Sequence, residues 1–379
     1  MEGAVSQTYK PENVKMSLKP KILDRYIMGK FLSTFFIALL IIIGIVIIFD
    51  ISEKIENFVE HEVPLKTIIF DYYVNFIPYF INMFSPFFVF ITVIFFTSRM
   101  AANSEIIAIL SGGISYHRMM VPYVISAAII ALLSLGLNLF VIPRSNATRV
   151  DFETKYVDQN YTKYNRNNVH YQIAPGQFVY VQSFSSYNNT AYKFTLETIE
   201  NNKMVSKLTA ESAAWDSTMD GWHLRRWFIR DYGSGLEDKV RCGNQLDTVI
   251  ALKLSDFYRN QKTVETLTRN ELNALINTQK MRGDSNVMYA QIEKHRRMTL
   301  PFSAFILTIM AVALTSKKKR GGIGFNLAIG IGLAFLYILF LKFSEMFVFT
   351  GTLSAGWALW LPNFVYAARA AFLYRIAPK

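Results

Sequence analysis

Apolar residues in this chain occur in long uninterrupted runs, which are separated by polar and charged segments. A helix needs about 20 apolar residues to cross a bilayer, and runs of that length predict six spanning helices. They cover Phe31–Phe49, Ile68–Thr97, Met119–Ile142, Met298–Thr315, Ile323–Leu341 and Trp357–Tyr374. The interval between the third and fourth runs has a different pattern, so two kinds of structure are expected.

Between residues 143 and 297, short segments alternate apolar and polar side chains, which is the period of a β-strand. Val169–Ile173 and Phe178–Gln182 are two such segments, with a Pro175-Gly176 turn between them. Turn signals recur about every ten residues, and seven or more short strands so spaced predict a β-sandwich or jelly roll. Further strands are expected at 191–199, 206–214, 221–231 and 248–252.

The predicted fold is therefore a membrane α-helical protein with an all-β, jelly-roll-like domain inserted between helices three and four. A polar, basic segment covers residues 1–30, and spans one to three cover 31–142. The β-domain and a connecting helix cover 143–297, and spans four to six cover 298–379. The connecting helix is expected over Thr268–Gln279, because Thr268 is a typical N-cap and Glu271 stands three residues later.

Charge indicates the orientation. Six basic residues in the N-terminal segment precede the first span, whereas the loop Asp50–Lys66 is mainly acidic, and Ser316–Arg320 is again basic. Basic loops stay in the cytoplasm, so both termini are expected inside and the β-domain outside. The same rule explains the net charge of +12 without a nucleic-acid partner.

Candidate chemistry is sparse. The single cysteine, Cys242, allows no internal disulfide, and the first apolar run is expected to stay as an uncleaved anchor. The sequence contains no Walker A motif, no H-E-x-x-H, no G-x-S-x-G and no Cys/His cluster, so no catalytic residue, metal site or cofactor is predicted. Few carboxylates fall within the spans, which disfavours a proton-coupled carrier. Energy is expected from another subunit.

The segment Arg99–Gly113 is the only structured candidate for receiving that energy. It is too short and polar for a span and too apolar for an ordinary loop. On one continuous helix its small residues and single acid share a stripe, which suits docking against another protein, and Gly112-Gly113 would end the helix. The alternative is a surface turn with a solvated acid. The predicted contact residues are Arg99, Ala101, Ser104, Glu105, Ala108 and Gly112.

Basic residues also stand at the predicted outer boundary, where the positive-inside rule does not favour them. Arginines there can bind phosphate with two hydrogen bonds, although interfacial anchors snorkelling to headgroups are the alternative. The candidates for substrate binding are Lys54, Arg144, Arg149, Arg296, Arg297 and Lys342. Within the β-domain, packing is the first interpretation of the large aromatics, and a groove for acyl chains is the second. These aromatics are Tyr180, Trp215, Trp222 and Trp227.

Four stretches resemble the lipopolysaccharide-export permeases of the LptF/LptG type. They are Leu23–Lys30 (LDRYIMGK), which is similar to the start of the LptG-like branch, the segment from Ser98 to Gly113, the β-domain phrase Tyr171–Gln182, and Glu293–Arg297 followed by Leu300-Pro301. They cover nearly the whole chain in the right order. One departure is that the outer end of span one is largely acidic, with Lys54 as its main positive residue.

The resemblance implies one permease of an ATP-driven transporter in the bacterial inner membrane. A second permease of the family and a cytoplasmic ABC ATPase dimer, which holds ATP and Mg, would be its partners. The cargo would be lipopolysaccharide, passed to periplasmic jelly-roll proteins that bridge to the outer membrane. Glu105 takes the position that docks into the ATPase, spans one and five form a lateral gate, and basic residues contact the phosphorylated lipid. A membrane-anchored scaffold acting through its β-domain, and a flippase acting alone, are the alternatives.

Overall fold

The computed structural model describes residues 21–157, 166–233, 238–258, 261–284, 286–316 and 322–377. The basic markers at 1–20 and 317–320 lie outside them. Among the described residues, five helical stretches are long and apolar enough to cross a membrane. They are Ile22–Glu60, Leu65–Ala102, Tyr116–Tyr156, Val287–Thr315 and Gly322–Phe349. The sixth expected span lies on another long helix, α12 (Ala355–Ile376), so the six-span count remains a prediction.

The helices extend beyond the apolar runs that predict them. Helix α1 covers Ile22–Glu60, and the second stretch joins α2 (Leu65–Thr67), a π-helical turn η1 (Ile68–Tyr73) and α3 (Val74–Ala102). The third joins α5 (Tyr116–Gly136), η2 (Leu137–Val141) and α6 (Ile142–Tyr156), while α10 (Val287–Thr315) and α11 (Gly322–Phe349) are single helices. Polar residues continue these helices because intrahelical hydrogen bonds satisfy the backbone equally well in water.

Helix α10 lies at the centre of the bundle and packs on α3, α5 and α12, while α11 packs on α3 and α12. In α3 and α10, 61% of the most apolar window is buried, against 17% in α1 and 22% in α11. The exposed apolar side chains of α1 and α11 include Leu40, Ile48, Phe335 and Phe343. These two helices therefore present apolar faces that this chain does not cover.

The β-domain is one antiparallel sheet whose six strands follow in sequence order. They are β1 (Arg166–Ala174), β2 (Gln177–Ser185), β3 (Thr190–Glu200), β4 (Lys203–Asp216), β5 (Gly221–Asp231) and β6 (Lys239–Thr248). The predicted all-β domain is confirmed, but the described strands form a single meander, so the sandwich or jelly-roll arrangement is not confirmed. Strand β6 was not expected, and the expected strand at 248–252 is instead a covering segment whose Ile250 and Leu252 are buried.

Packing is the role of the central tryptophan of the sheet. Trp222 is fully buried, donates from Nε1 to the carbonyl of Leu252 at 2.8 Å, and meets Trp215 edge to face. Trp227 donates to the carbonyl of Gln245 at 3.0 Å. The packing interpretation is thus confirmed for Trp222, since a buried indole N–H requires an acceptor.

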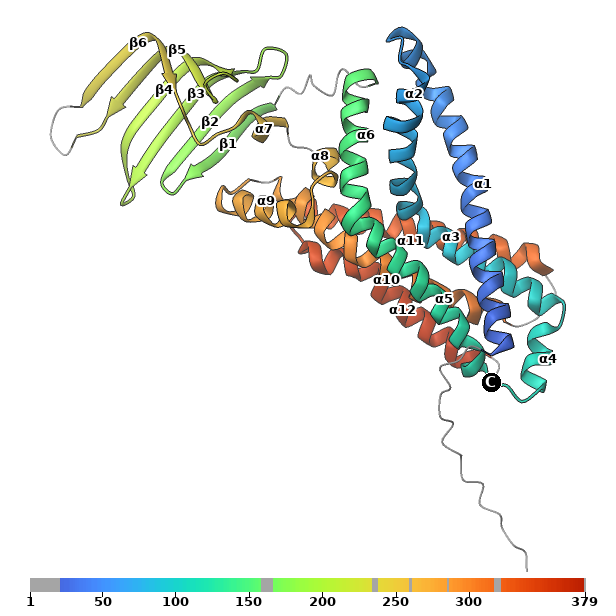
Figure 1. Cartoon of the computed structure of the whole chain (residues 1–379). Coiled ribbons are helices and arrows are strands. Elements are labelled where there is room, and N and C mark those ends of the chain that lie inside the picture. Colours follow the sequence, from blue (N-terminus) through green and yellow to red (C-terminus); the bar gives the residue numbers. More distant parts are fainter. Residues whose placement is uncertain are drawn as a thin grey trace, which may run out of the picture.

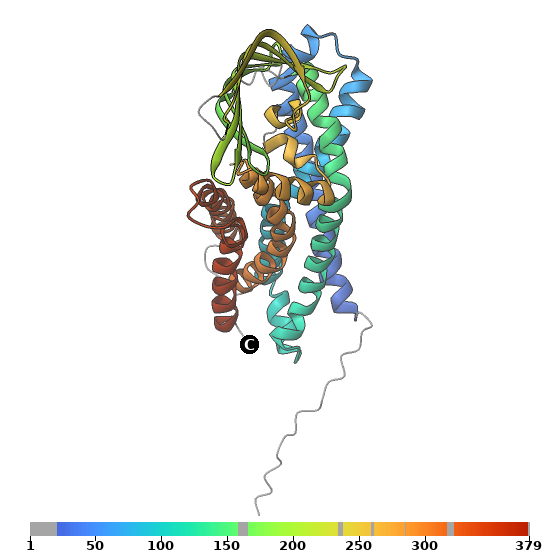
Figure 2. The same cartoon turned by 90° about the vertical axis from the view of Figure 1, so that its left-hand side faces the viewer.

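Three short helices connect the sheet to the bundle: α7 (Leu254–Tyr258), α8 (Gln261–Glu265) and α9 (Arg269–Met281). The predicted cap of α9 is confirmed, because Glu271 accepts from the backbone N–H of Thr268 at 2.9 Å. The loop after α9 meets β1, where the N–H of Gln172 donates to the carbonyl of Arg282 at 3.1 Å. The sheet lies at one end of the bundle and α4 (Glu105–Ser111) at the other (Figures 1 and 2).

Candidate functional site

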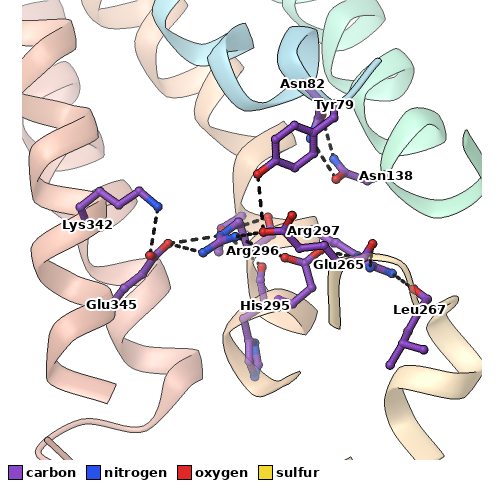
Figure 3. A network of polar contacts seen from close by, with 12 residues as sticks. Tyr79, Asn82, Asn138, Glu265, Leu267, His295, Arg296, Arg297, Lys342 and Glu345 are labelled. Carbon is purple, nitrogen blue, oxygen red and sulfur yellow. Dashed lines mark hydrogen bonds and ion pairs between the residues drawn. The ribbon is translucent and has the colours of Figure 1, made fainter. Parts of the chain in front are cut away.

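Arg296 lies among three carboxylates that come from three helices (Figure 3). Its guanidinium is 2.8 Å from Glu345 of α11, 3.4 Å from Glu293 of α10 and 3.6 Å from Glu265 of α8. The side chain of Arg296 is only 17% exposed. Because a buried charge is stable only when it is paired, this guanidinium ties α8, α10 and α11 together. We call Glu265, Glu293, Arg296, Arg297 and Glu345 the Arg296 network.

Arg297 holds the connector between α8 and α9. It donates from Nε to Glu293 at 2.8 Å, from Nη1 to the carbonyl of Leu267 at 2.9 Å, and from Nη2 to the carbonyl of Glu265 at 3.3 Å. Arg297 is 4% exposed. Its hydrogen bonds therefore fasten the β-domain connector to α10 in this structure.

The carboxyl group of Glu265 has a raised pKa within the network. Burial raises the pKa of its carboxyl, and the neighbouring Glu293 raises it further, although Arg296 and Arg149 act in the opposite direction. Tyr79 of α3 donates to Glu265 at 3.5 Å, and the guanidinium of Arg149 stacks over the Tyr79 ring at 4.4 Å. The network thus extends from α10 through Tyr79 to α6.

A small cavity with a mixed lining and a larger apolar cavity meet beside this network. Arg296, Lys342 and the carboxylates of Glu293 and Glu345 line the small cavity together with apolar side chains, and its volume is about 90 Å³. The apolar cavity, between α1, α3 and α5, measures about 490 Å³. Asn82 lines both cavities and exchanges hydrogen bonds of 3.0 and 2.9 Å with Asn138. Charged groups of both signs therefore stand next to apolar volume, where a polar head and an apolar chain of an amphiphile could lie side by side.

The structure groups four of the six predicted basic residues. Arg149, Arg296, Arg297 and Lys342 join through Tyr79 and the carboxylates, with Lys342 at 3.3 Å from Glu345 and half exposed. Arg144 is exposed on α6 and forms no ion pair with the described residues. Lys54 belongs to a separate cluster, where it pairs with Asp50 at 2.7 Å and meets the Tyr72 hydroxyl.

Sequence reasoning missed the acidic half of the network. The spacing of Glu293 and Arg297, four residues apart on a helix, is a local signal that predicts their ion pair. Glu265 and Glu345 give no such signal, because their partner lies on another helix. Only the packing of α8 and α11 against α10 reveals them.

At the opposite end of the bundle, the predicted continuous helix over 99–113 is interrupted. Helix α3 ends at Ala102, and Ser104 adopts a positive φ of 62°, which breaks the helix before α4 begins at Glu105. Ala101 is buried in α3, so the proposed single stripe is wrong. The predicted stop is confirmed, because α4 ends at Ser111 and Gly113 has a φ of 84°. The remaining predicted contact residues Arg99, Ser104, Ala108 and Gly112 are exposed.

Glu105 fastens α4 to the start of α1. Its carboxylate accepts from the Tyr26 hydroxyl at 2.8 Å and lies 3.5 Å from Lys30 Nζ. Burial disfavours the ionised form, but these two partners outweigh it and lower the pKa of the Glu105 carboxyl. A displacement of α4 would therefore be transmitted to the start of α1.

Comparison with known proteins identifies this arrangement. The family model "Lipopolysaccharide export system permease LptF/LptG" matches residues 25–376, which is nearly the whole chain. The chain belongs to the LptF/LptG permease family. A search of curated proteins finds no match. The family model spans both branches, so the LptG-like leaning stays a prediction. LptF/LptG membership makes this chain a transporter permease of lipopolysaccharide export rather than a catalytic enzyme, and the long apolar helices agree with a multi-pass inner-membrane protein.

Proposed function

We propose that this LptF/LptG chain is one permease subunit of an ATP-driven transporter that extracts lipopolysaccharide from the outer leaflet of the inner membrane. The observation that carries the proposal is α4, a short exposed helix that the Glu105 contacts fasten to the start of α1. The β-domain at the other end of the bundle would face the periplasm and pass the cargo to bridge proteins.

A separate cytoplasmic ABC ATPase dimer, with its own ATP and Mg, supplies the energy in this proposal. The support is the absence of a nucleotide-binding motif from the sequence. Helix α4 is the contact, because its exposed face carries Ala108 and the half-exposed Ile107. The hydrogen bond between Tyr26 and Glu105 would transmit its movement to α1.

A second permease of the same family covers the apolar faces of α1 and α11 in this proposal. Their low burial leaves these faces available for contact with a second subunit or with lipid, because large exposed apolar faces mark sites of protein or membrane interaction. The cargo would enter between the two subunits. Its phosphorylated head would lie by the cavity lined by Arg296 and Lys342, and its acyl chains beside the apolar cavity across Asn82. The other predicted basic residues would contribute positive potential near the cargo or stabilise the helices that line the cavities. They are Lys54, Arg144, Arg149 and Arg297.

The substitution Glu105→Ala tests the proposal, with Tyr26→Phe as its matched control. Both variants remove the hydrogen bond between positions 26 and 105, but only Glu105→Ala also removes the Lys30 contact and the carboxylate that would meet the ATPase. Co-purification of the ATPase with the tagged permease is expected to fall in Glu105→Ala and to persist in Tyr26→Phe. Release of lipopolysaccharide from proteoliposomes by ATP is measured in parallel. Normal ATPase retention and export by Glu105→Ala would overturn the coupling role.

A further inference from the structure

A cleft of about 640 Å³ lies between α9, α10 and the start of α12. His295 forms part of its wall. Although it is the neighbour of Arg296 in the sequence, its side chain points away from the Arg296 network in Figure 3. Gly356 of α12 lies against the imidazole, because a Cβ there would stand 3.4 Å from His295 Cε1. The cleft is therefore a separate feature, on another side of α10 from the proposed cargo cavity.

The cleft is positively charged. Lys280 at the end of α9 and Lys294 on α10 line it, and both are exposed. Neither lysine side chain forms an ion pair or hydrogen bond with the described residues, and no carboxylate is among the described residues that line the cleft. Lys342, in contrast, is paired with Glu345. Two unneutralised ammonium groups at one cleft favour an anionic ligand.

An aromatic ridge continues from the cleft along α12. Trp357 is 70% exposed and Phe364 is 52% exposed, although both belong to a long apolar helix. Trp360 stacks on Phe364 with ring centroids 5.9 Å apart and meets Phe302 of α10 at 5.3 Å. The spacing 357, 360 and 364 places the three α12 rings on one helix face. Tryptophans are enriched at the membrane–water interface.

We infer that this cleft binds an anionic phospholipid of the leaflet on the β-domain side, with its phosphate between Lys280 and Lys294 and an acyl chain along the Trp357–Phe364 ridge. A lipid explains both observations, because the lysines match a phosphodiester and the ridge matches an acyl chain. A free anion would contact only the two lysines and would leave the aromatic ridge unused. The bound lipid would bridge α9, which carries the β-domain connector, to α12. It is a resident lipid, distinct from the cargo of the proposed function.

Tryptophan quenching by brominated lipids tests this inference on the full chain in detergent micelles. The chain has five tryptophans, of which Trp357 and Trp360 lie at the cleft. Brominated phosphatidylglycerol is expected to quench at lower lipid fractions than brominated phosphatidylcholine. In the double variant Lys280→Gln/Lys294→Gln the preference should fall by about thirtyfold, since each lysine near an anionic surface contributes about 1 kcal/mol. Lys66→Gln, on an exposed residue outside the cleft, should keep the full preference.

Three results would overturn the inference. Equal quenching by the two lipids would show that the headgroup charge is not recognised. An unchanged preference in the double lysine variant would place the site elsewhere. Displacement of phosphatidylglycerol by millimolar inorganic phosphate would indicate a site for soluble anions. A further variant, Trp357→Phe/Trp360→Phe, is expected to abolish the phosphatidylglycerol-dependent quenching, and quenching that persists in it would also contradict the assignment.

Discussion

Arg118 donates two hydrogen bonds to Asp24, from Nη1 to Oδ1 at 2.7 Å and from Nη2 to Oδ2 at 2.6 Å. The pair joins the first turn of α5 to the first turn of α1, next to the contact between Tyr26 and Glu105. Paired donors on a planar guanidinium fix orientation as well as distance. The beginning of α1 is therefore held from two sides, by α4 and by α5.

The substitution Asp24→Ala should lower the free energy of unfolding by about 2 kcal/mol, because it leaves Arg118 without its buried partner. This loss is smaller than the loss expected on breaking a fully buried ion pair, since the Arg118 side chain is 35% exposed. Denaturant unfolding of the purified chain in micelles measures it. Glu56→Ala, on an exposed residue of the same helix, is the control and should be nearly neutral. An equal loss in both variants would contradict the role of the pair.

Gly330 of α11 allows a close approach to Ile94 of α3, because a Cβ at Gly330 would overlap Ile94 Cδ1. Gly330→Leu is expected to destabilise the chain by about 1–3 kcal/mol through overpacking. Adding Ile94→Ala should recover part of this loss. The double variant should therefore lose less free energy of unfolding than the sum of the losses in the two single variants. A double-mutant cycle of unfolding measurements checks the coupling. Strict additivity would show that α11 does not rest on Ile94.

Gly176 occupies the turn between β1 and β2 with a φ of 75°, and a Cβ there would collide with the carbonyl oxygen of Ile199. Gly176→Ala should therefore destabilise the β-domain by about 2 kcal/mol. Asn201→Gly is the contrasting variant, because Asn201 has a φ of 49° and glycine relieves that conformation. Fluorescence of the β-domain tryptophans during unfolding is the readout. A neutral Gly176→Ala would refute the steric argument.

His223 of β5 makes the stability of the sheet depend on pH. It bonds to Asp247 of β6, and to Asp216 at 2.9 Å, and these bonds raise the pKa of the imidazole above 6.5. The stabilisation is fully present below pH 6.5, the unfolded value, and is lost as pH rises through the raised folded pKa. The pKa of Asp216 is lowered to about 2, chiefly by its Thr218 hydrogen bonds. The contribution of the Asp216 carboxylate to the stability of the sheet is therefore lost only in strong acid.

Unfolding midpoints at pH 6 and pH 8 test the role of His223. The wild-type sheet should be more stable at pH 6, and His223→Gln should flatten the difference. His170→Gln, in strand β1, is the control and should retain it. A difference that survives in His223→Gln would assign the pH dependence to another group.

The sequence predicts those features that depend on local pattern or composition. The apolar runs predict the long helices, the alternation predicts β1 to β5, and Thr268 with Glu271 predicts the cap of α9. Strand β6 escapes prediction because most of its side chains are exposed, so it has no apolar–polar alternation. The segment 248–252 has the sequence pattern of a strand, but in the structure it covers the sheet. There the carbonyl of Leu252 accepts a hydrogen bond from Trp222.

The candidate sites divide in the same way. Glu105 stands out in the sequence as the single acid of its segment, but the break at Ser104 depends on how α4 docks against α1. The basic residues of the Arg296 network attract notice by their place beside the spans. Their carboxylate partners Glu265 and Glu345 are distant in sequence, and only tertiary packing selects them.

The contacts of Arg297 have a consequence for the order of assembly. Its two backbone acceptors, the carbonyls of Glu265 and Leu267, are synthesised before α10, and domains generally fold as units from the N-terminal side. The sheet and its connector thus emerge from synthesis before the Arg297 contacts can form. The contacts of Glu265 with Tyr79 and of Lys262 with Glu153 involve earlier helices and need no part of α10, whereas the Arg297 contacts complete the attachment of the connector only when α10 has been made.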